Sequence, residues 1–237
     1  VCEILDARIP ISSRNPDIDA ICGKKPRMVI LNRIDMADAD LVSRWSNYFK
    51  DRGMAVIRTD CKSRKGINTF APAVRQLLAE KLQRYAEKGQ VGRPLKLMVV
   101  GIPNVGKSTF INQIAGRKGA KAENRPGVTR GKQWVNVDGG LLLLDTPGIL
   151  WPKFDDPEVG MRLAYTGAVK DDILDTETLG CHLMELLARE YPQALVERYK
   201  IEIPTKVDGW ELLQAAGRKR GFLVSGGEVD TERMAKV

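Results

Sequence analysis

Residues that build metal sites, disulfide frameworks and membrane spans are scarce in this sequence. The chain of 237 residues has one histidine, His182, and its four cysteines share no paired spacing. Because a zinc site needs clustered cysteine and histidine ligands, no structural metal is expected, and the cysteines are expected to be reduced and buried. The apolar runs are strand-sized, far short of the roughly 20 residues that cross a bilayer. These absences favour a globular protein that works away from membranes.

Positive charge is what the sequence has in excess, and it is unevenly placed. Residues 1–150 carry 26 Lys/Arg against 14 Asp/Glu, or +12, whereas residues 151–237 carry 12 against 16, or −4, which together give +8. A basic first part favours a phosphate-rich partner. Charge alone is equally compatible with a surface that is merely solubilised by its basic residues.

Strand-like apolar runs alternate with helical patterns in the first two thirds of the chain. Helical periodicity covers Asp40–Lys50 and Ile67–Tyr85, and Asp138–Gly140 is a good hairpin turn. This alternation predicts an α/β fold with a mainly parallel sheet, covered by helices and ending in one antiparallel pair. The expected strands are Val1–Leu5, Arg27–Leu31, Met54–Ile57, Leu95–Val100, Trp134–Val137 and Leu141–Leu144.

The strand patterns stop after about Pro157. Helices are expected at Thr176–Glu190, Gln193–Tyr199 and Trp210–Gly217. We therefore predict two domains, an α/β domain over residues 1–160 and a small α-helical domain over residues 161–237. Within the first domain, the polar segment Glu87–Pro94, rich in glycine and proline, is typical of a linker.

A phosphate-binding pattern lies in the middle of the chain. Gly101–Ser108 matches G-x-x-x-x-G-K-[ST], follows an expected strand and opens a helical pattern. Backbone amides of such a loop approach phosphates closely, and the helix N-terminus adds positive potential. Lys107 is expected to reach the β- and γ-phosphates, and Ser108 to hold Mg²⁺. The predicted phosphate-side residues are Asn104, Val105, Gly106, Lys107, Ser108 and Thr109.

Two later segments are candidates for the Mg²⁺ ion and the γ-phosphate. Asp145-Thr146-Pro147-Gly148 ends an apolar strand, which places Asp145 near the ion and the amide of Gly148 near the γ-phosphate. Thr129, in Arg125–Arg130, is the candidate switch threonine that closes on Mg²⁺, although it is also compatible with an ordinary loop residue. We therefore predict metal ligation by Ser108, Thr129 and Asp145, and catalytic roles for Lys107, Thr129 and Gly148.

A base-reading pattern precedes the phosphate loop. Asn32-Arg33-Ile34-Asp35 is similar to the guanine-reading Asn-Lys-x-Asp, with Asp35 expected to accept hydrogen bonds from the base. Arg33 replaces the usual lysine and is expected to stack on the ring. Cys61 and Lys62 lie in the loop that is expected to support the base through backbone amides. These patterns predict binding of GTP and GDP.

The order of the two patterns is reversed relative to an ordinary small GTPase, in which the phosphate loop comes first. The base-reading motif lies about seventy residues before Gly101–Ser108. The sequence therefore predicts a circularly permuted P-loop GTPase.

With these motifs in this order, nearly the whole chain resembles the circularly permuted GTPases of the YlqF/RbgA type. That resemblance implies GTP hydrolysis with Mg²⁺, a role in late maturation of the large ribosomal subunit, and binding to its ribosomal RNA. It also implies a cytoplasmic protein, or an organelle-matrix one if a targeting segment precedes Val1, and we expect a monomer. The segments that carry the resemblance are Asp6–Pro16, Gly101–Thr109, Arg125–Thr129, Asp145–Phe154 and Ser225–Gly227.

The residue after Gly148 limits the mechanism. Ras-like enzymes place a water-orienting glutamine there, whereas this chain has Ile149, which cannot polarise water. The resembling family shares this replacement, and a histidine upstream of its Asp-Ala-Arg segment is proposed to help. His182 is expected to be an ordinary helix residue. Hydrolysis is therefore expected to be slow alone and stimulated by the ribosome.

The sequence is therefore interpreted as a GTP hydrolase that acts as an assembly switch and favours the pre-ribosome in its GTP form. Other functions compete with this interpretation. A guanine-nucleotide-sensing module with negligible turnover is the alternative that Ile149 leaves open. An RNA-modifying enzyme would need a separate catalytic pocket, and a permuted GTPase with an OB-fold and zinc module would need a Cys/His cluster; neither is visible. No aromatic-rich RNA-reading motif is present. Arg218-Lys219-Arg220 suits either an RNA contact or a solvated helix end.

Overall fold

The structure is a computed structural model, and it describes residues 1–116, 133–137, 140–148, 150–151, 154–169 and 175–237. The chain divides into two compact units, Val1–Leu163 and Ala164–Val237. The expected domain boundary after residue 160 stays a prediction. Among the residues described, every helix is too short or too polar to cross a lipid bilayer.

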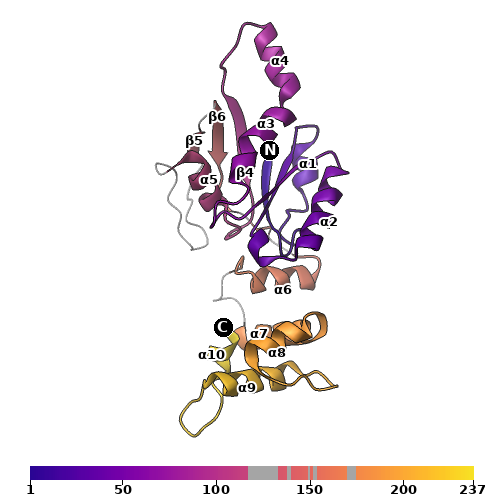
Figure 1. The fold of residues 1–237 in the computed structure, drawn as a ribbon, viewed down its shortest axis with the longest axis vertical. Coiled ribbons are helices and arrows are strands. Elements are labelled where there is room, and N and C mark those ends of the chain that lie inside the picture. Colours follow the sequence, from indigo (N-terminus) through magenta and orange to yellow (C-terminus); the bar gives the residue numbers. More distant parts are fainter. Residues whose placement is uncertain (117–132, 138–139, 149, 152–153, 170–174) are drawn as a thin grey trace. The chain divides into compact units, whose positions relative to one another are not determined.

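The described part of unit 1 is built on a six-stranded sheet in the order β3-β2-β1-β4-β6-β5 (Figure 1). Neighbouring strands are parallel except β5 and β6, which form an antiparallel pair at the edge. This confirms the predicted α/β fold with its mainly parallel sheet and single hairpin. The strands are β1 Cys2–Asp6, β2 Met28–Asn32, β3 Ala55–Thr59, β4 Leu95–Val100, β5 Gln133–Val137 and β6 Leu141–Asp145.

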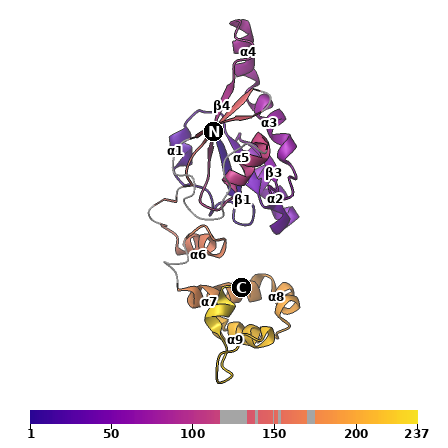
Figure 2. The same ribbon diagram turned by 90° about the vertical axis from the view of Figure 1, so that its left-hand side faces the viewer.

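Apolar strand residues explain why the sheet takes helices on both faces. Every residue of β1 and β2 is buried, as expected for central strands covered on both sides. On one face, Leu5, Val29 and Leu31 pack against Val42 and Phe49 of α2 (Ala39–Lys50). The other face carries α3 (Phe70–Leu77) and α5 (Lys107–Ala115), which lie side by side in Figure 2.

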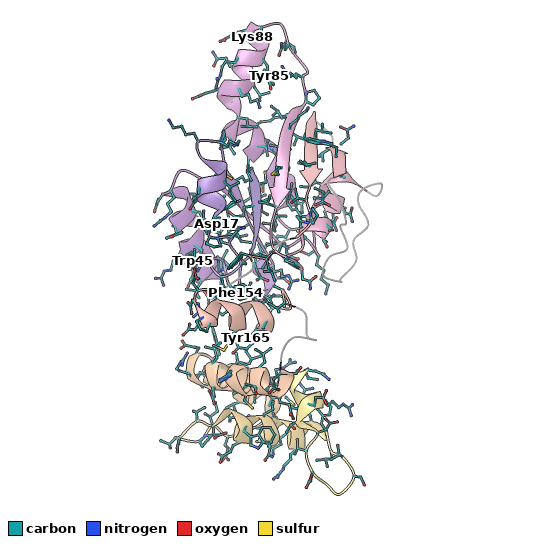
Figure 3. The ribbon with its side chains drawn as sticks, turned by 180° about the vertical axis from the view of Figure 1, so that it is seen from behind. Asp17, Trp45, Tyr85, Lys88, Phe154 and Tyr165 are labelled. Carbon is teal, nitrogen blue, oxygen red and sulfur yellow. The ribbon has the colours of Figure 1, made fainter. Side chains whose placement is uncertain are left out.

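The helical pattern over Ile67–Tyr85 does not form one helix. It is divided into η2 (Ile67–Thr69), α3 and α4 (Ala79–Glu87), with a bend at Leu78 (φ −109°, ψ 20°). Packing explains the division, because α3 buries Phe70 and Val74 whereas α4 buries no side chain. Figure 3 shows Tyr85 on α4 and Lys88 just after its end, both away from the sheet. Residues 88–94, inside the predicted linker, form no helix or strand.

Several short elements had no counterpart among the predicted ones. They are α1 (Ile18–Cys22), η1 (Ile34–Met36), α6 (Pro157–Tyr165) and α10 (Thr231–Ala235). Three of them are only three to five residues long by their bounds, too short for a hydrophobic period to show. The expected burial of the cysteines holds for Cys2, Cys22 and Cys61, whereas Cys181 is only partly buried.

Unit 2 is helical and has its own core. Its helices α7 (Thr176–Glu190), α8 (Pro192–Tyr199) and α9 (Gly209–Arg220) match the three predicted ones closely. The side chains of Asp175 and Asp208 each accept two backbone amides at the start of α7 and α9, and Asp230 accepts one, from Arg233, at the start of α10. The core is formed by Met184, Ala188, Leu195, Tyr199, Ile201, Leu212, Leu213, Ala216 and Met234.

Gly209 gives the sharpest test of this packing. A methyl group at this first position of α9 would lie 2.7 Å from the carbonyl carbon and 3.0 Å from Cα of Cys181 on α7. Helix propensity by itself favours alanine over glycine by about 1 kcal/mol. We expect Gly209→Ala instead to lower the free energy of unfolding of unit 2 by about 2 kcal/mol or more, because α7 and α9 must separate.

Denaturant unfolding followed by circular dichroism measures the effect. Gln214→Ala, in the same helix, is the control and should change stability by less than about 0.5 kcal/mol. A stabilised Gly209→Ala protein would contradict the close approach of the two helices.

Candidate functional site

The candidate residues gather where the parallel strands end. Asp6, Asn32, Thr59, Val100 and Asp145 are the last residues of β1, β2, β3, β4 and β6, and these strands run in the same direction. Their carboxyl ends therefore meet at one edge of the sheet, which is where open α/β sheets bind ligands. Segments about seventy residues apart in the sequence become neighbours at this edge.

The phosphate loop has the backbone shape that its sequence predicts. Asn104 (φ 58°) and Gly106 (φ 97°) both adopt left-handed conformations, and α5 starts at Lys107. Gly106 accepts the amide of Phe110 at 2.8 Å, which begins the helical hydrogen bonds. A turn of this kind points successive amides to one side and forms an anion-binding concavity at the helix N-terminus.

Two glycines allow close packing around the phosphate loop. A Cβ on Gly101 would lie 2.8 Å from the carbonyl oxygen of Ile4 in β1. A Cβ on Gly148 would lie 2.9 Å from Cα of Pro103. Glycine is therefore required at both positions by close approach, and Gly148 lies against the phosphate loop that it is predicted to serve.

A buried ion pair lies at the centre of the site. Lys107 Nζ is 3.3 Å from Asp145 Oδ1, and their side chains are only 6% and 1% exposed. Within the described residues, neither carboxylate oxygen of Asp145 accepts a hydrogen bond. Because buried polar atoms are rarely left without partners, this carboxylate fits a role as a ligand for a hard cation. Ser108, half-buried in the first turn of α5, supplies a hydroxyl oxygen, which is also a ligand that hard cations prefer.

Asn32 joins the phosphate side of the site to the base side. Its Nδ2 donates to the carbonyl of Val105 at 2.9 Å, and its Oδ1 accepts the Thr59 hydroxyl and the Cys61 amide, both at 3.2 Å. The side chain is 2% exposed. The residue predicted as a base reader therefore has most of its hydrogen-bonding capacity engaged in holding two loops together.

Arg33 reaches the phosphate loop from the same motif. It adopts φ 65°, and its Nη2 donates to the carbonyl of Asn104 at 2.6 Å. Its Nη1 lies 3.9 Å from Asp6 Oδ2, and Asp6 accepts two further guanidinium bonds from Arg8, at 2.9 and 2.7 Å. The hydrogen bond to Asp6 raises the pKa of Arg8. Stacking of Arg33 on the base stays a prediction, and in this structure its guanidinium is held by Asp6 and Asn104.

The loop after β3 is closed on itself. Asp60 accepts the amides of Lys62 and Ser63 at 2.8 and 3.3 Å, and its own amide donates to the carbonyl of Lys65 at 3.0 Å. Hydrogen bonds, first from the Ser63 side chain, lower the pKa of Asp60, so it stays charged. Burial raises the pKa of the Cys61 thiol to about 12, which keeps it neutral. The amides of Cys61 and Lys62, predicted to support the base, already have partners within the protein.

The remaining candidates lie on η1, α5, α7 and α9, or outside the described residues. Asp35 is exposed in η1 beyond β2, and Thr109 follows Ser108 in α5. Thr129, with Arg125–Arg130, and Ile149 lie outside the described residues. His182 is half-exposed on α7, 3.6 Å from Glu185, and Arg218-Lys219-Arg220 form the exposed last turn of α9.

Sequence reasoning missed Thr59, Asp60 and the pairing of Asp6 with Arg8. Thr59 supports Asn32, and Asp60 shapes the base loop. Asp6 and Arg8 appeared in the sequence only as part of the Asp-Ala-Arg segment, for which no structural or chemical role was predicted. Asp6 and Thr59 are the last residues of β1 and β3, and Asp60 directly follows β3, so polar residues at the ends of strands would have pointed to the same edge of the sheet.

This arrangement defines a P-loop protein in which the segments predicted to read the base precede the phosphate loop. The profile of a family described as "50S ribosome-binding GTPase" matches residues 96–201. A protein of Priestia megaterium named Ribosome biogenesis GTPase A is 46% identical over 239 residues, covering 100% of this chain and 82% of that protein. Its namesake in Thermotoga maritima is 30% identical, covering 98% of this chain and 77% of that protein.

Similarity extends to an organellar protein and to solved structures. Mitochondrial ribosome-associated GTPase 1 of Xenopus tropicalis is 34% identical, covering 86% of this chain and 68% of that protein. The crystal structure of GNP-bound YlqF from T. maritima has a TM-score of 0.68 and 27% identity, covering 99% of this chain and 83% of that one. The chain belongs to the Ribosome biogenesis GTPase A family and is a GTPase.

The contact between Gly106 and Asn32 generates a prediction about nucleotide binding. A Cβ at residue 106 would collide with Asn32 Nδ2, and φ is +97° there. Displacing the Asn32 amide breaks the junction between the two loops, so we expect Gly106→Ala to lower GDP affinity at least about tenfold. Fluorescence titration with a labelled GDP measures this.

Gly116→Ala is the matched control. Gly116 also has a positive φ, of +73°, yet no heavy atom lies within 4 Å of a Cβ built there. It carries the backbone strain without the collision and should keep wild-type GDP affinity. Equal losses in the two variants would assign the effect to strain alone.

Proposed function

We propose that this GTPase acts as an assembly switch in late maturation of the large ribosomal subunit, binding the precursor particle and its ribosomal RNA in the GTP state. The junction made by Asn32 carries this proposal, because it joins a phosphate loop to a base-reading motif in one site. The names of the bacterial relatives support a task in ribosome biogenesis. They also favour the bacterial cytoplasm over an organelle matrix as the place of action.

In the proposed mechanism, Lys107 pairs with the β- and γ-phosphates when nucleotide enters. Its ammonium group now pairs with Asp145 at 3.3 Å, so phosphate oxygens would replace one carboxylate as its counter-charge. Ser108, Asp145 and Thr129 would hold Mg²⁺, which supplies positive charge against the phosphates. Electrostatic stabilisation in this buried setting is the largest contribution that such a site makes to phosphoryl transfer.

On the base side, Asp35 is proposed to accept the N1 and N2 protons of guanine. Its exposure at the end of β2 leaves its carboxylate available to a ligand. Asn32 and Arg33 act chiefly by fixing this motif against the carbonyls of Val105 and Asn104. Cys61 and Lys62 are proposed to flank the base through the loop backbone.

The switch is proposed to lie on the γ-phosphate side. Thr129 and Gly148 would close on the γ-phosphate in the GTP state and open after hydrolysis, which changes affinity for the particle. Gly148 already lies against Pro103 of the phosphate loop. Because Ile149 cannot orient water, turnover is proposed to be slow until the particle completes the site. We propose that the protein acts as a monomer.

Exchanging Asp35 for asparagine should change base specificity. An amide donates where the carboxylate accepts, so it no longer matches the guanine N1 and N2 protons but matches the additional oxygen of xanthine. We expect Asp35→Asn to bind GDP at least about hundredfold more weakly and to bind XDP more tightly than the wild type does.

Competition titrations with GDP, XDP and ADP measure this change. Asp38→Asn, which removes a nearby exposed carboxylate at the start of α2, serves as the control and should keep guanine preference. Retention of full GDP affinity by Asp35→Asn would remove Asp35 from the site.

Cosedimentation with purified large ribosomal subunits tests the assembly switch. We expect stronger retention with a non-hydrolysable GTP analogue than with GDP, and faster GTP turnover when subunits are added. Equal retention in both states would contradict the switch. Tight nucleotide binding without turnover on saturating subunits would contradict slow but stimulated hydrolysis.

A further inference from the structure

The loop after β3 displays positive charge that the nucleotide site does not use. Lys62, Arg64 and Lys65 are exposed, and we call them the cationic loop face. The single carboxylate of this loop, Asp60, is buried and turned inward to accept the amides of Lys62 and Ser63. The loop therefore presents its cations to solvent and keeps its anion inside.

The backbone that carries these cations is held in one shape. The amide of Asp60 donates to the carbonyl of Lys65 at 3.0 Å, and the amide of Cys61 donates to Asn32 Oδ1 at 3.2 Å. Gly66, at φ +77°, packs so closely that a Cβ would collide with the carbonyl oxygen of Arg58. A partner that binds charges on a pre-ordered loop loses less conformational entropy on association.

Two segments next to each other in this part of unit 1 contain no acidic residue. The segment 61–79 contains four Lys/Arg (Lys62, Arg64, Lys65 and Arg75) and no Asp or Glu, and the segment 101–116 also has none. The two segments are neighbours, because Phe70 and Phe110 stack edge to face at 5.2 Å and Arg64 Nη2 donates to the carbonyl of Gln113 at 3.4 Å. Figure 2 shows α3 and α5 side by side. Ordinary protein surfaces intersperse the two signs of charge, so this one is unusual.

Segments 61–79 and 101–116, all of them described, expose no large apolar side chain that could serve as an anchor. A lipid surface or a hydrophobic protein groove would call for such an anchor. An array of phosphates calls only for cations and hydrogen-bond donors.

From these observations we infer that the cationic loop face binds the phosphate backbone of ribosomal RNA. The inference rests on the proposed function and names a contact surface for it. Because the loop is fastened by Asn32 and Asp60, and not by residues on the γ-phosphate side, its contribution to RNA affinity is the same in the GTP and GDP states. Any state dependence of binding comes from other parts of the molecule.

The test is the salt dependence of binding to deproteinised large-subunit ribosomal RNA, with intact subunits as a second probe. Arg64→Gln/Lys65→Gln removes two cations and leaves Lys62 in place, because its backbone is a candidate base contact. We expect about tenfold weaker binding and a decrease of about 1.5 in the slope of log affinity against log salt, in both nucleotide states. Labelled-GDP titration and the thermal midpoint verify that the variant is folded.

Two variants serve as controls. Lys24→Gln/Lys25→Gln removes the same charge from another exposed place in unit 1 and should bind RNA like the wild type. Arg64→Lys/Lys65→Arg keeps the charge and should keep the salt slope. If the lysine-pair control loses as much affinity as Arg64→Gln/Lys65→Gln, net charge and not this face is responsible, and the inference fails.

Other outcomes separate this inference from the function on which it rests. A wild-type protein that binds neither RNA nor subunits in any nucleotide state would overturn the proposed function itself. Wild-type binding with an unchanged Arg64→Gln/Lys65→Gln variant would overturn only the inference. Loss of binding to intact subunits but not to bare RNA would identify an acidic protein as the partner and would also overturn it.

Discussion

The hydrogen bonds of Asn32 are the constraint on which the rest of the site depends. One buried amide joins the end of β2 to the carbonyl of Val105 in the phosphate loop and to the amide of Cys61 in the base loop. Each such bond adds only about 0.5–1.5 kcal/mol to stability, but leaving one buried partner unpaired costs about 1–3 kcal/mol. The two loops are therefore held in register, and Arg33 adds a second tie to Asn104.

A second constraint on the site is its pair of buried charges. Lys107 and Asp145 are both removed from solvent and lie 3.3 Å apart, an arrangement whose desolvation cost is large and whose net stabilisation is small. The carboxylate of Asp145 also accepts no hydrogen bond within the described residues. Such a pair is better explained by function than by stability, because phosphate and a cation would satisfy both groups. Asp6 contrasts with it, since its carboxylate is fully engaged by Arg8 and neighbours Arg33.

The permuted order of the motifs leaves this geometry intact because the sheet, not the sequence, sets which loops meet. β1 and β4 are neighbours in the middle of the sheet, although β1 lies at the start of the sequence and β4 follows the base-side half of the domain. Parallel strands bring their carboxyl ends together whatever their order in the sequence. The connection between the halves, residues 88–94 after α4, lies at the opposite end of β4 from the phosphate loop. It can therefore vary without disturbing the site.

The sequence by itself determined the six strands, the mainly parallel sheet, the helices of unit 2 and the phosphate loop, because these depend on local periodicity and on a motif with its own conformational demands. Tertiary structure alone decided that Asn32 spans two loops, that Arg33 contacts Asn104 and Asp6, and that Thr59 and Asp60 support the base side. It also decided where the pattern over Ile67–Tyr85 bends, because burial of Phe70 and Val74 ends with α3. Contacts between residues far apart in sequence leave no periodic signal, and only the folded sheet brings those residues within hydrogen-bonding distance.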